Sequence, residues 1–226
     1  MTMSDKDLTT IRSKLAVMGK LASSMFNDAS LALAKSDREL SREVIAKDSQ
    51  VDSLENEIEG LCLTFLALKA PKALELRFAV AVTRLTNEIE RIADHATVMC
   101  RENLARHLGP FWAKAPEFGR MTAMAGSMVT RAMDCFFASD DMAYQGLLED
   151  DKKVGELQQK LNAWLIDMMA KDADKGLDIV SLLNILRRIE RVADHAKNIG
   201  VMVPYVTKGI LLRHNRGDGQ DADNGE

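Results

Sequence analysis

The chain has 226 residues, of which 46% are hydrophobic and 5% aromatic, and its formal net charge is -4. This length and hydrophobic content suit a folded protein with a sizeable core, and the charge argues against a broad nucleic-acid-binding surface. With 13 Met, four Pro and so few aromatic residues, the composition favours long helices over a β-sandwich.

Apolar residues recur every three or four positions along three successive segments, which predicts three long helices. The first helix ends near Ala34. Ser36 with Glu39 has the spacing of a capping box and is expected to open the second helix. Pro71 stands where the first turn of a helix tolerates proline, and the third helix is expected over about 72–101.

The segment 89–96 reads IleGluArgIleAlaAspHisAla and returns at 189–196 with a single Ile to Val change, so seven of eight residues are identical. A repeat at a separation of 100 residues indicates that one structural unit is used twice. Gly109 and Pro110 break the helical pattern between the two copies. The second unit is therefore expected to repeat the three helices of the first.

The predicted fold is all-α and consists of two tandem three-helix bundles with six long antiparallel helices. We assign the first repeat to residues 1–107 and the second repeat to residues 108–212. Pro204 is expected to kink or end the last helix. Residues 213–226 are polar and rich in Gly and Asp, and we expect them to be disordered.

Acidic residues follow one side of the second predicted helix within an arc of about 60°. They are Asp48, Asp52, Glu55 and Glu59, and we call them the acidic stripe. The positions 103 residues further on hold Asp151, Gly155, Gln158 and Asn162. The second repeat therefore lacks three of the four charges.

Packing of the second helix on the third would bring Asp48 and Asp52 opposite Glu90 and Asp94. Four carboxylates at one seam repel one another unless a cation lies between them. An all-oxygen ligand set suits a hard ion such as Mg²⁺, Mn²⁺, Ca²⁺ or iron better than structural zinc.

The alternative is a solvated acidic face whose charges are neutralised by basic neighbours as weak surface pairs. The candidate basic residues are Arg84, Arg91, Arg187, Arg191 and Lys197. His95 and His195 follow the Asp of each signature, and we interpret them as residues that support the ligands rather than bind the metal.

These residues resemble the PhoU family of phosphate-transport accessory and regulatory proteins. The family carries an ERIGDH-like string, which segments 90–95 and 190–195 match with Ala93 and Ala193 in place of its Gly. The likeness includes the DxxxD of Asp48 and Asp52 and covers nearly the whole chain to about residue 206. Upstream of the first string, Ala70, Pro71, Leu76 and Arg77 look like the Pro-containing segment that leads into the third helix in this family.

The resemblance implies two three-helix bundles and, in some members, multinuclear metal sites on paired E/DxxxD motifs, with Mg, Mn, Fe or Zn as candidate metals. It assigns the first site to Asp48, Asp52, Glu90 and Asp94. It assigns the second site to Asp151, Glu190 and Asp194, where Gly155 replaces the expected acid.

The resemblance also implies a cytoplasmic regulator, taken here as a homodimer, that works with the ATPase of a phosphate ABC transporter and with a phosphate-sensing histidine kinase. The leading hypothesis is a non-catalytic adaptor that represses phosphate uptake and the starvation response and reaches the membrane only through partners. Walker A, GxSxG and HExxH motifs are absent from the sequence, which argues against an enzyme. The alternatives are an adaptor for another transporter or a metal-homeostasis circuit, and a carboxylate-bridged metalloenzyme.

Cys62, Cys100 and Cys135 are odd in number, widely spaced and outside any CxxC motif. We therefore expect buried thiols in a reducing compartment rather than disulfides or a zinc cluster. The first residues lack a basic and then apolar leader, and no stretch reaches about 18 consecutive apolar residues, which favours a cytoplasmic protein.

Overall fold

The computed structural model describes residues 3–106, 108–140, 142 and 144–210, and every regular element within them is a helix. The six long helices of the prediction are present, together with one short helix and one 3₁₀ turn, so the all-α prediction is confirmed. The elements are α1 (Met3–Lys35), α2 (Arg38–Lys69), α3 (Ala73–Ala105), α4 (Gly109–Lys114), α5 (Pro116–Ala138), α6 (Tyr144–Lys171), η1 (Ala173–Lys175) and α7 (Gly176–Lys208). The predicted disordered tail, 213–226, lies outside the described residues.

The N-cap of α2 is Asp37, so the prediction of a capping box on Ser36 is wrong. Asp37 Oδ1 accepts hydrogen bonds from the backbone N–H groups of Glu39 and Leu40, each at 3.0 Å. Ser36 instead has a left-handed backbone with φ of 52° and follows the end of α1. Asp37 has the extended backbone that an N-cap needs, with φ of -80° and ψ of 104°.

The turn between α1 and α2 is fixed onto α3 by Asn103, whose side chain is buried. Asn103 Nδ2 donates to the backbone carbonyls of Ala32 and Asp37, at 3.2 and 3.3 Å, and to Ser41 Oγ at 2.9 Å. One amide therefore satisfies buried acceptors from both ends of the turn and holds the three helices of the first bundle together.

The structure places Pro71 outside the helix turn predicted for it and Pro204 inside the last helix. Pro71 belongs to the connection before α3, and the extended residue Lys72 is the N-cap, so the prediction of Pro71 in the first turn is wrong. Pro204 lies inside α7, which continues to Lys208 rather than ending at the proline. The C-terminal turn of α7 closes normally, because the N–H of Gly209 donates to the carbonyl of Tyr205 at 3.0 Å.

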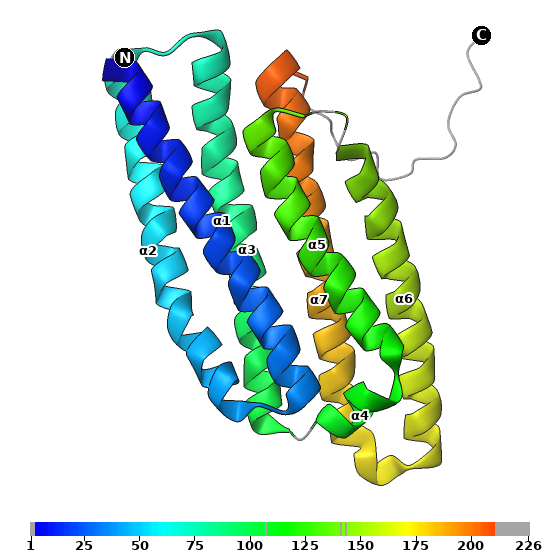
Figure 1. Ribbon diagram of the computed structural model, residues 1–226. Coiled ribbons are helices and arrows are strands. Elements are labelled where there is room, and N and C mark those ends of the chain that lie inside the picture. Colours follow the sequence, from blue (N-terminus) through cyan, green and yellow to red (C-terminus); the bar gives the residue numbers. More distant parts are fainter. Residues whose placement is uncertain (1–2, 107, 141, 143, 211–226) are drawn as a thin grey trace, which may run out of the picture.

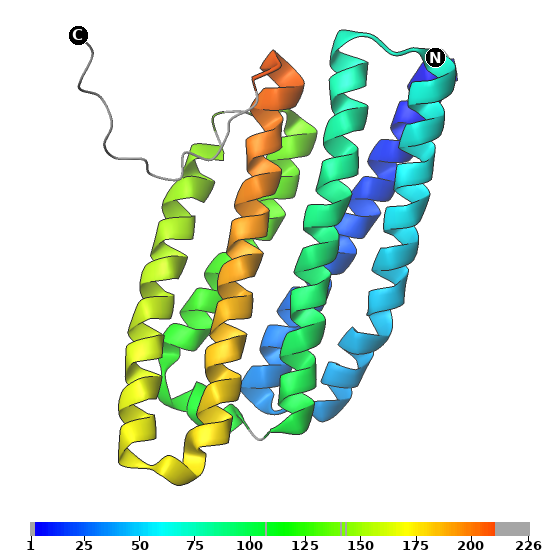
Figure 2. The same cartoon turned by 180° about the vertical axis from the view of Figure 1, so that it is seen from behind.

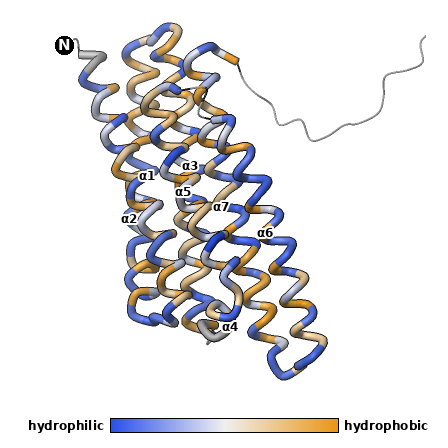
Figure 3. The backbone as a smooth tube through the Cα atoms, turned by 45° about the vertical axis from the view of Figure 1, so that its right-hand side comes forward, coloured by the Kyte–Doolittle hydropathy of each residue, from blue (hydrophilic) through white to orange (hydrophobic). Residues whose placement is uncertain are grey.

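The two bundles lie side by side, with α1, α2 and α3 in one and α5, α6 and α7 in the other (Figure 1). Seen from behind, α3 and α7 run in opposite directions next to each other through the middle of the molecule (Figure 2). Helices α2 and α6 form its two outer edges. Hydrophilic and hydrophobic residues alternate along the helices, as expected for amphipathic helices that share a core (Figure 3).

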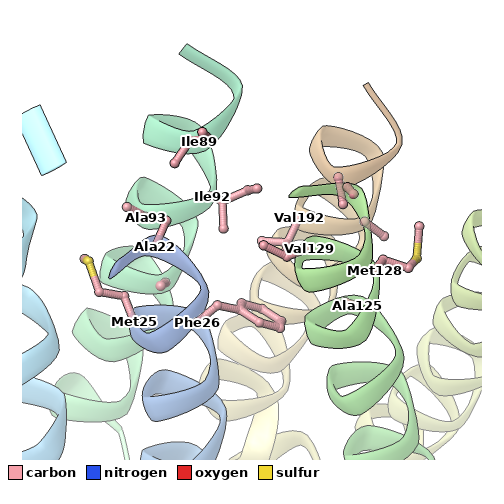
Figure 4. Close-up of a cluster of buried hydrophobic side chains, with 14 of the residues drawn as sticks. Ala22, Met25, Phe26, Ile89, Ile92, Ala93, Ala125, Met128, Val129 and Val192 are labelled. Carbon is pink, nitrogen blue, oxygen red and sulfur yellow. The ribbon is translucent and has the colours of Figure 1, made fainter. Parts of the chain in front are cut away.

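One hydrophobic core runs through both bundles. Figure 4 shows side chains of α1, α3, α5 and α7 gathered in it, among them Phe26, Ile92, Val129 and Val192. Helix α4 begins just after the predicted boundary between residues 107 and 108, contacts α1 and α5, and contributes the buried Trp112. The two repeats therefore stabilise each other by burying a common apolar surface.

The three cysteines are buried free thiols, as predicted. None of the helices in the described part of the chain combines the length and apolar character needed to cross a bilayer.

Candidate functional site

The carboxylates predicted for the first site meet at the seam between α2 and α3. Thr97 Oγ1 on α3 donates a hydrogen bond to Asp48 Oδ1 on α2 at 3.1 Å, which holds Asp48 against α3. Burial raises the pKa of Asp48, and the negative charges of Asp52 and Asp94 raise it further. Asp52 and Asp94 are therefore close enough to Asp48 to destabilise its ionised form.

Glu90 is the most perturbed acid of this seam. Its Oε2 atom is buried and accepts no hydrogen bond from any residue that the structure describes, although Arg91 Nε lies 3.5 Å away. Burial, followed by the charge of Asp94, raises the pKa of Glu90 to about 7, and Arg91 offsets only part of this effect. An acid buried with an unsatisfied oxygen needs a further positive partner or a proton to be stable.

The acidic stripe continues this negative region along α2. Burial raises the pKa of Glu55, and the charges of Glu59 and Asp52 raise it further. Arg91 offers the opposing charge, and its Nη1 lies 3.4 Å from Asp94 Oδ2. The half-exposed Arg91 and Arg101, whose charge lowers the pKa of Asp48, are fewer than the carboxylates, so the seam keeps an excess of negative charge.

The first-repeat residues fit a hard cation in their chemistry and charge. All four are carboxylates, one of their oxygens is orphaned, and an ion would offset both the burial and the repulsion that raise the pKa values of Asp48 and Glu90. They do not form a finished cage, since no group of three or more His, Cys, Asp or Glu in the described residues has the arrangement of a metal site. Metal binding at Asp48, Asp52, Glu90 and Asp94 therefore stays a prediction.

The second repeat brings its predicted acids together around a lysine. Lys197 Nζ lies 2.8 Å from Asp151 Oδ2 and 2.6 Å from Asp194 Oδ1. Burial by itself would raise the pKa of Asp194, but the hydrogen bond and charge of Lys197 lower it overall. Gly155 adds no ligand, and open space lies where its side chain would begin. Asp151, Glu190 and Asp194 do not fit a metal ion while this ammonium lies between them.

Glu190 lies beside this pair and resembles Glu90. Burial raises its pKa, whereas Arg191, with Nε 3.9 Å from Glu190 Oε2, acts in the opposite direction. The basic residues named as candidate partners thus differ in role. Arg91 and Arg191 make loose contacts beside their acids, Arg84 lies over the ring of Tyr205 on α7, and Lys197 joins α7 to α6 by pairing with an acid.

A contact between the repeats involves Glu88, which the sequence analysis missed. Glu88 Oε2 on α3 lies 2.7 Å from His195 Nδ1 and accepts a hydrogen bond from Asn198 Nδ2 at 3.1 Å, both on α7. The spacing of seven residues between Glu88 and His95 was the available signal, because it places both on one face of a helix.

The two signature histidines face each other in this contact, with ring centroids 5.3 Å apart. Burial and then the neighbouring His195 lower the pKa of His95 to about 4, and His95 Nε2 has no hydrogen-bond partner among the described residues. The histidines therefore lie at the α3–α7 interface rather than among the carboxylates. This arrangement lacks the inward-facing Glu-x-x-His ligands of ferritin-like enzymes.

Comparison with known proteins agrees with this geometry. A model of the PhoU domain matches the chain twice, over residues 15–102 and 118–203. The phosphate-specific transport system accessory protein PhoU of Serratia marcescens is 30% identical over 215 residues, covering 94% of this chain and 87% of that protein. The accessory protein PhoU of Escherichia coli strain K12 is 28% identical over 218 residues, covering 95% of this chain and 89% of its own length.

Two solved structures share the fold. The crystal structure of PhoU from Pseudomonas aeruginosa has a TM-score of 0.84 and 27% identity, and the match covers 91% of this chain and 99% of that chain. The structure of the phosphate transport system regulatory protein PhoU from Streptococcus pneumoniae has a TM-score of 0.84 and 23% identity, and the match covers 93% of this chain and 100% of that chain. At this identity the match supports a shared fold only. With its signature duplicated on two joined three-helix bundles and both copies matched by the domain model, the chain belongs to the PhoU family.

Proposed function

We propose that this protein is a non-catalytic cytoplasmic regulator of phosphate transport that represses phosphate uptake and the phosphate-starvation response. The observation that carries the proposal is the 30% identity to the Serratia marcescens accessory protein over 94% of this chain. The duplicated signature and the absence of nucleotide-binding and protease motifs from the sequence support a role without chemistry of its own.

The proposed partners are the ATPase of a phosphate ABC transporter and a phosphate-sensing histidine kinase. Helices α2 and α6 lie at opposite edges of the molecule, so two proteins have separate surfaces on which to bind (Figure 1). A shared core makes the two bundles one body, which suits a protein that holds two partners in a fixed relation. We further propose that the regulator acts as a homodimer.

At the first seam we propose a hard cation, Mg²⁺, Mn²⁺ or iron, held by Asp48, Asp52, Glu90 and Asp94. The unsatisfied Oε2 of Glu90 and the repulsion among these acids support it. When bound, the ion supplies positive charge that joins α2 to α3. Elemental analysis of the purified protein tests this, because a Glu90→Gln, Asp94→Asn variant is expected to lose the metal and the exposed-site variant Glu43→Gln to retain it.

Deletion of the gene in its own organism tests the regulatory role. In high phosphate, a reporter driven by a starvation-induced promoter is expected to turn on in the deletion strain and to return to repression when the gene is restored. A pull-down with this protein is expected to recover the phosphate transporter ATPase in preference to the ATPase of an unrelated ABC transporter.

Continued repression in the deletion strain would contradict the proposal. Recovery of another transporter's ATPase, with normal phosphate regulation, would instead favour the alternative of a related adaptor in a different circuit.

A further inference from the structure

The same contact between helices is made by different chemistry in the two repeats. Position 97 of α3 and position 197 of α7 correspond through the 100-residue separation of the signatures, and Asp48 corresponds to Asp151. In the first repeat, the hydroxyl of Thr97 donates to Asp48 at 3.1 Å. In the second repeat, the ammonium of Lys197 donates to Asp151 at 2.8 Å.

The ammonium also reaches the acid of its own signature, since Lys197 Nζ lies 2.6 Å from Asp194 Oδ1. The hydroxyl of Thr97 carries no charge, and its single O–H donates to one acceptor, Asp48. Side-chain exposures of 15% for Lys197, 23% for Asp151 and 29% for Asp194 show that the three groups are largely shielded from water. Charge-assisted hydrogen bonds in such a setting are stronger than pairs on an open surface.

The charge around each seam has changed together with this residue. The first seam has Asp52, Glu55 and Glu59 on α2, where the second has Gly155, Gln158 and Asn162 on α6. A single ammonium hydrogen-bonds to both carboxylates of the second seam and offsets one of their two charges, but it would offset only one of the four charges of the acidic stripe. A lysine at position 197, in place of the threonine at position 97, therefore suits a seam that lacks three of the four acids of the stripe.

From this geometry we infer that Lys197 serves as the built-in counter-ion of the second carboxylate site and takes the place that a metal ion would hold there. The second repeat joins α6 to α7 through Asp151, Lys197 and Asp194 without needing an ion. The two repeats thus differ in their response to metal, although they share a signature and a fold. The inference concerns the second repeat alone and depends neither on the regulatory role nor on metal binding at the first seam.

The test removes the ammonium in a parent protein that carries Glu90→Gln and Asp94→Asn, so that two of the proposed metal ligands of the first seam are already absent. Lys197→Thr introduces the residue type found at position 97, and Lys171→Thr removes an exposed lysine that pairs with Asp167 on the surface of α6. Thermal unfolding is followed in EDTA and in Mn²⁺, and Mn²⁺ binding is measured by calorimetry.

In EDTA, Lys197→Thr is expected to lower the midpoint temperature of thermal unfolding by about 5 to 10 °C, because two shielded carboxylates lose their positive partner. The matched control Lys171→Thr is expected to change it by less than about 2 °C. Mn²⁺ is expected to raise the midpoint of the Lys197→Thr protein by at least about 3 °C and to leave the parent with Lys197 unchanged.

A parent that binds Mn²⁺ through Asp151, Glu190 and Asp194 while Lys197 is present would overturn the inference. An Lys197→Thr protein that unfolds at the same temperature as the control in EDTA, or that gains no response to Mn²⁺, would also overturn it. If Lys197→Thr does not fold, Lys197→Met is measured in its place, since it keeps most of the unbranched apolar stem and removes the ammonium. Lys197→Met is expected to show the same fall of the unfolding midpoint in EDTA, and the same rise in Mn²⁺, as Lys197→Thr.

Discussion

The raised pKa of Glu90 predicts a specific dependence of stability on pH in the metal-free protein. In the folded state this pKa is about 7, compared with an ordinary value of 4.5, so folding takes up a proton between these two values. The stabilisation by protonated Glu90 is therefore fully present below pH of about 4.5 and is lost as the pH rises through about 7. Glu90→Gln, which is always neutral, is expected to lack this dependence.

The difference between the two pKa values corresponds to about 3 kcal/mol, at about 1.4 kcal/mol per tenfold change in an equilibrium constant. Water screens part of this energy, because neighbouring Asp94 is 44% exposed. We therefore expect the free energy of unfolding of wild type, relative to Glu90→Gln, to fall by about 1 to 2 kcal/mol between pH 5 and pH 8.

Urea unfolding of both proteins in EDTA at pH 5, 6, 7 and 8 measures this difference. His95, whose pKa is lowered to about 4, loses stability in the opposite direction as the pH falls, but this contribution is common to both proteins and cancels. Glu43→Gln, at an exposed glutamate of α2, is the matched control and is expected to show no such trend. A difference between wild type and Glu90→Gln that stays flat or grows with pH would refute the reasoning.

Three further substitutions test the contacts that position the site. Asp37→Ala should lower the free energy of unfolding by about 1 kcal/mol by removing the N-cap of α2, whereas Ser36→Ala should change it by less than about 0.5 kcal/mol, as measured by urea unfolding. Asn103→Ala should cost about 2 to 3 kcal/mol, because the amide donates to two buried acceptors and one partly buried acceptor, and calorimetry should show that the midpoint of thermal unfolding falls by about 5 to 10 °C. Glu88→Ala should cost about 1 to 2 kcal/mol, because His195 loses its acceptor, and hydrogen exchange should accelerate first along α3 and α7. An Asp37→Ala protein as stable as wild type, or Glu88→Ala exchange that is faster only in α2, would contradict these assignments.

The helices and the seam could be predicted from the sequence because both depend on spacing along one helix. Apolar residues at intervals of three and four fix the buried face, and the same rule places Asp48 and Asp52 together on α2. The duplicated signature then indicated which acids of the next helix would face them. The metal itself is untested, since carboxylates at this spacing describe a charged seam and do not by themselves fix a coordination geometry.

The errors came from features that spacing does not determine. Ser36 and Asp37 are both good N-cap residues, and only the left-handed backbone at Ser36 decides between them. Of the two outcomes expected for Pro204, the end of the helix does not occur, because Pro204 lies buried within α7 and the helix continues to Lys208. Lys197 had been grouped with surface bases, although its alignment with Thr97 already marked a charge change at the site.

The signature places two different sets of contacts on two faces of the same helix. Glu90 and His95 are five residues apart, which separates them by about 140° around the helix axis. The carboxylates consequently face α2, while the histidine faces α7 and the other repeat. Ile92 and Ala93 lie between these two faces and are packed in the common core, so a shift of α3 that follows a change of charge at the first seam would also disturb its contact with α7. The contact of Lys197 lies elsewhere on α7, because it joins that helix to α6 through Asp151. The seam of the first repeat and the interface between the repeats therefore share α3, whereas the carboxylate seam of the second repeat does not involve it.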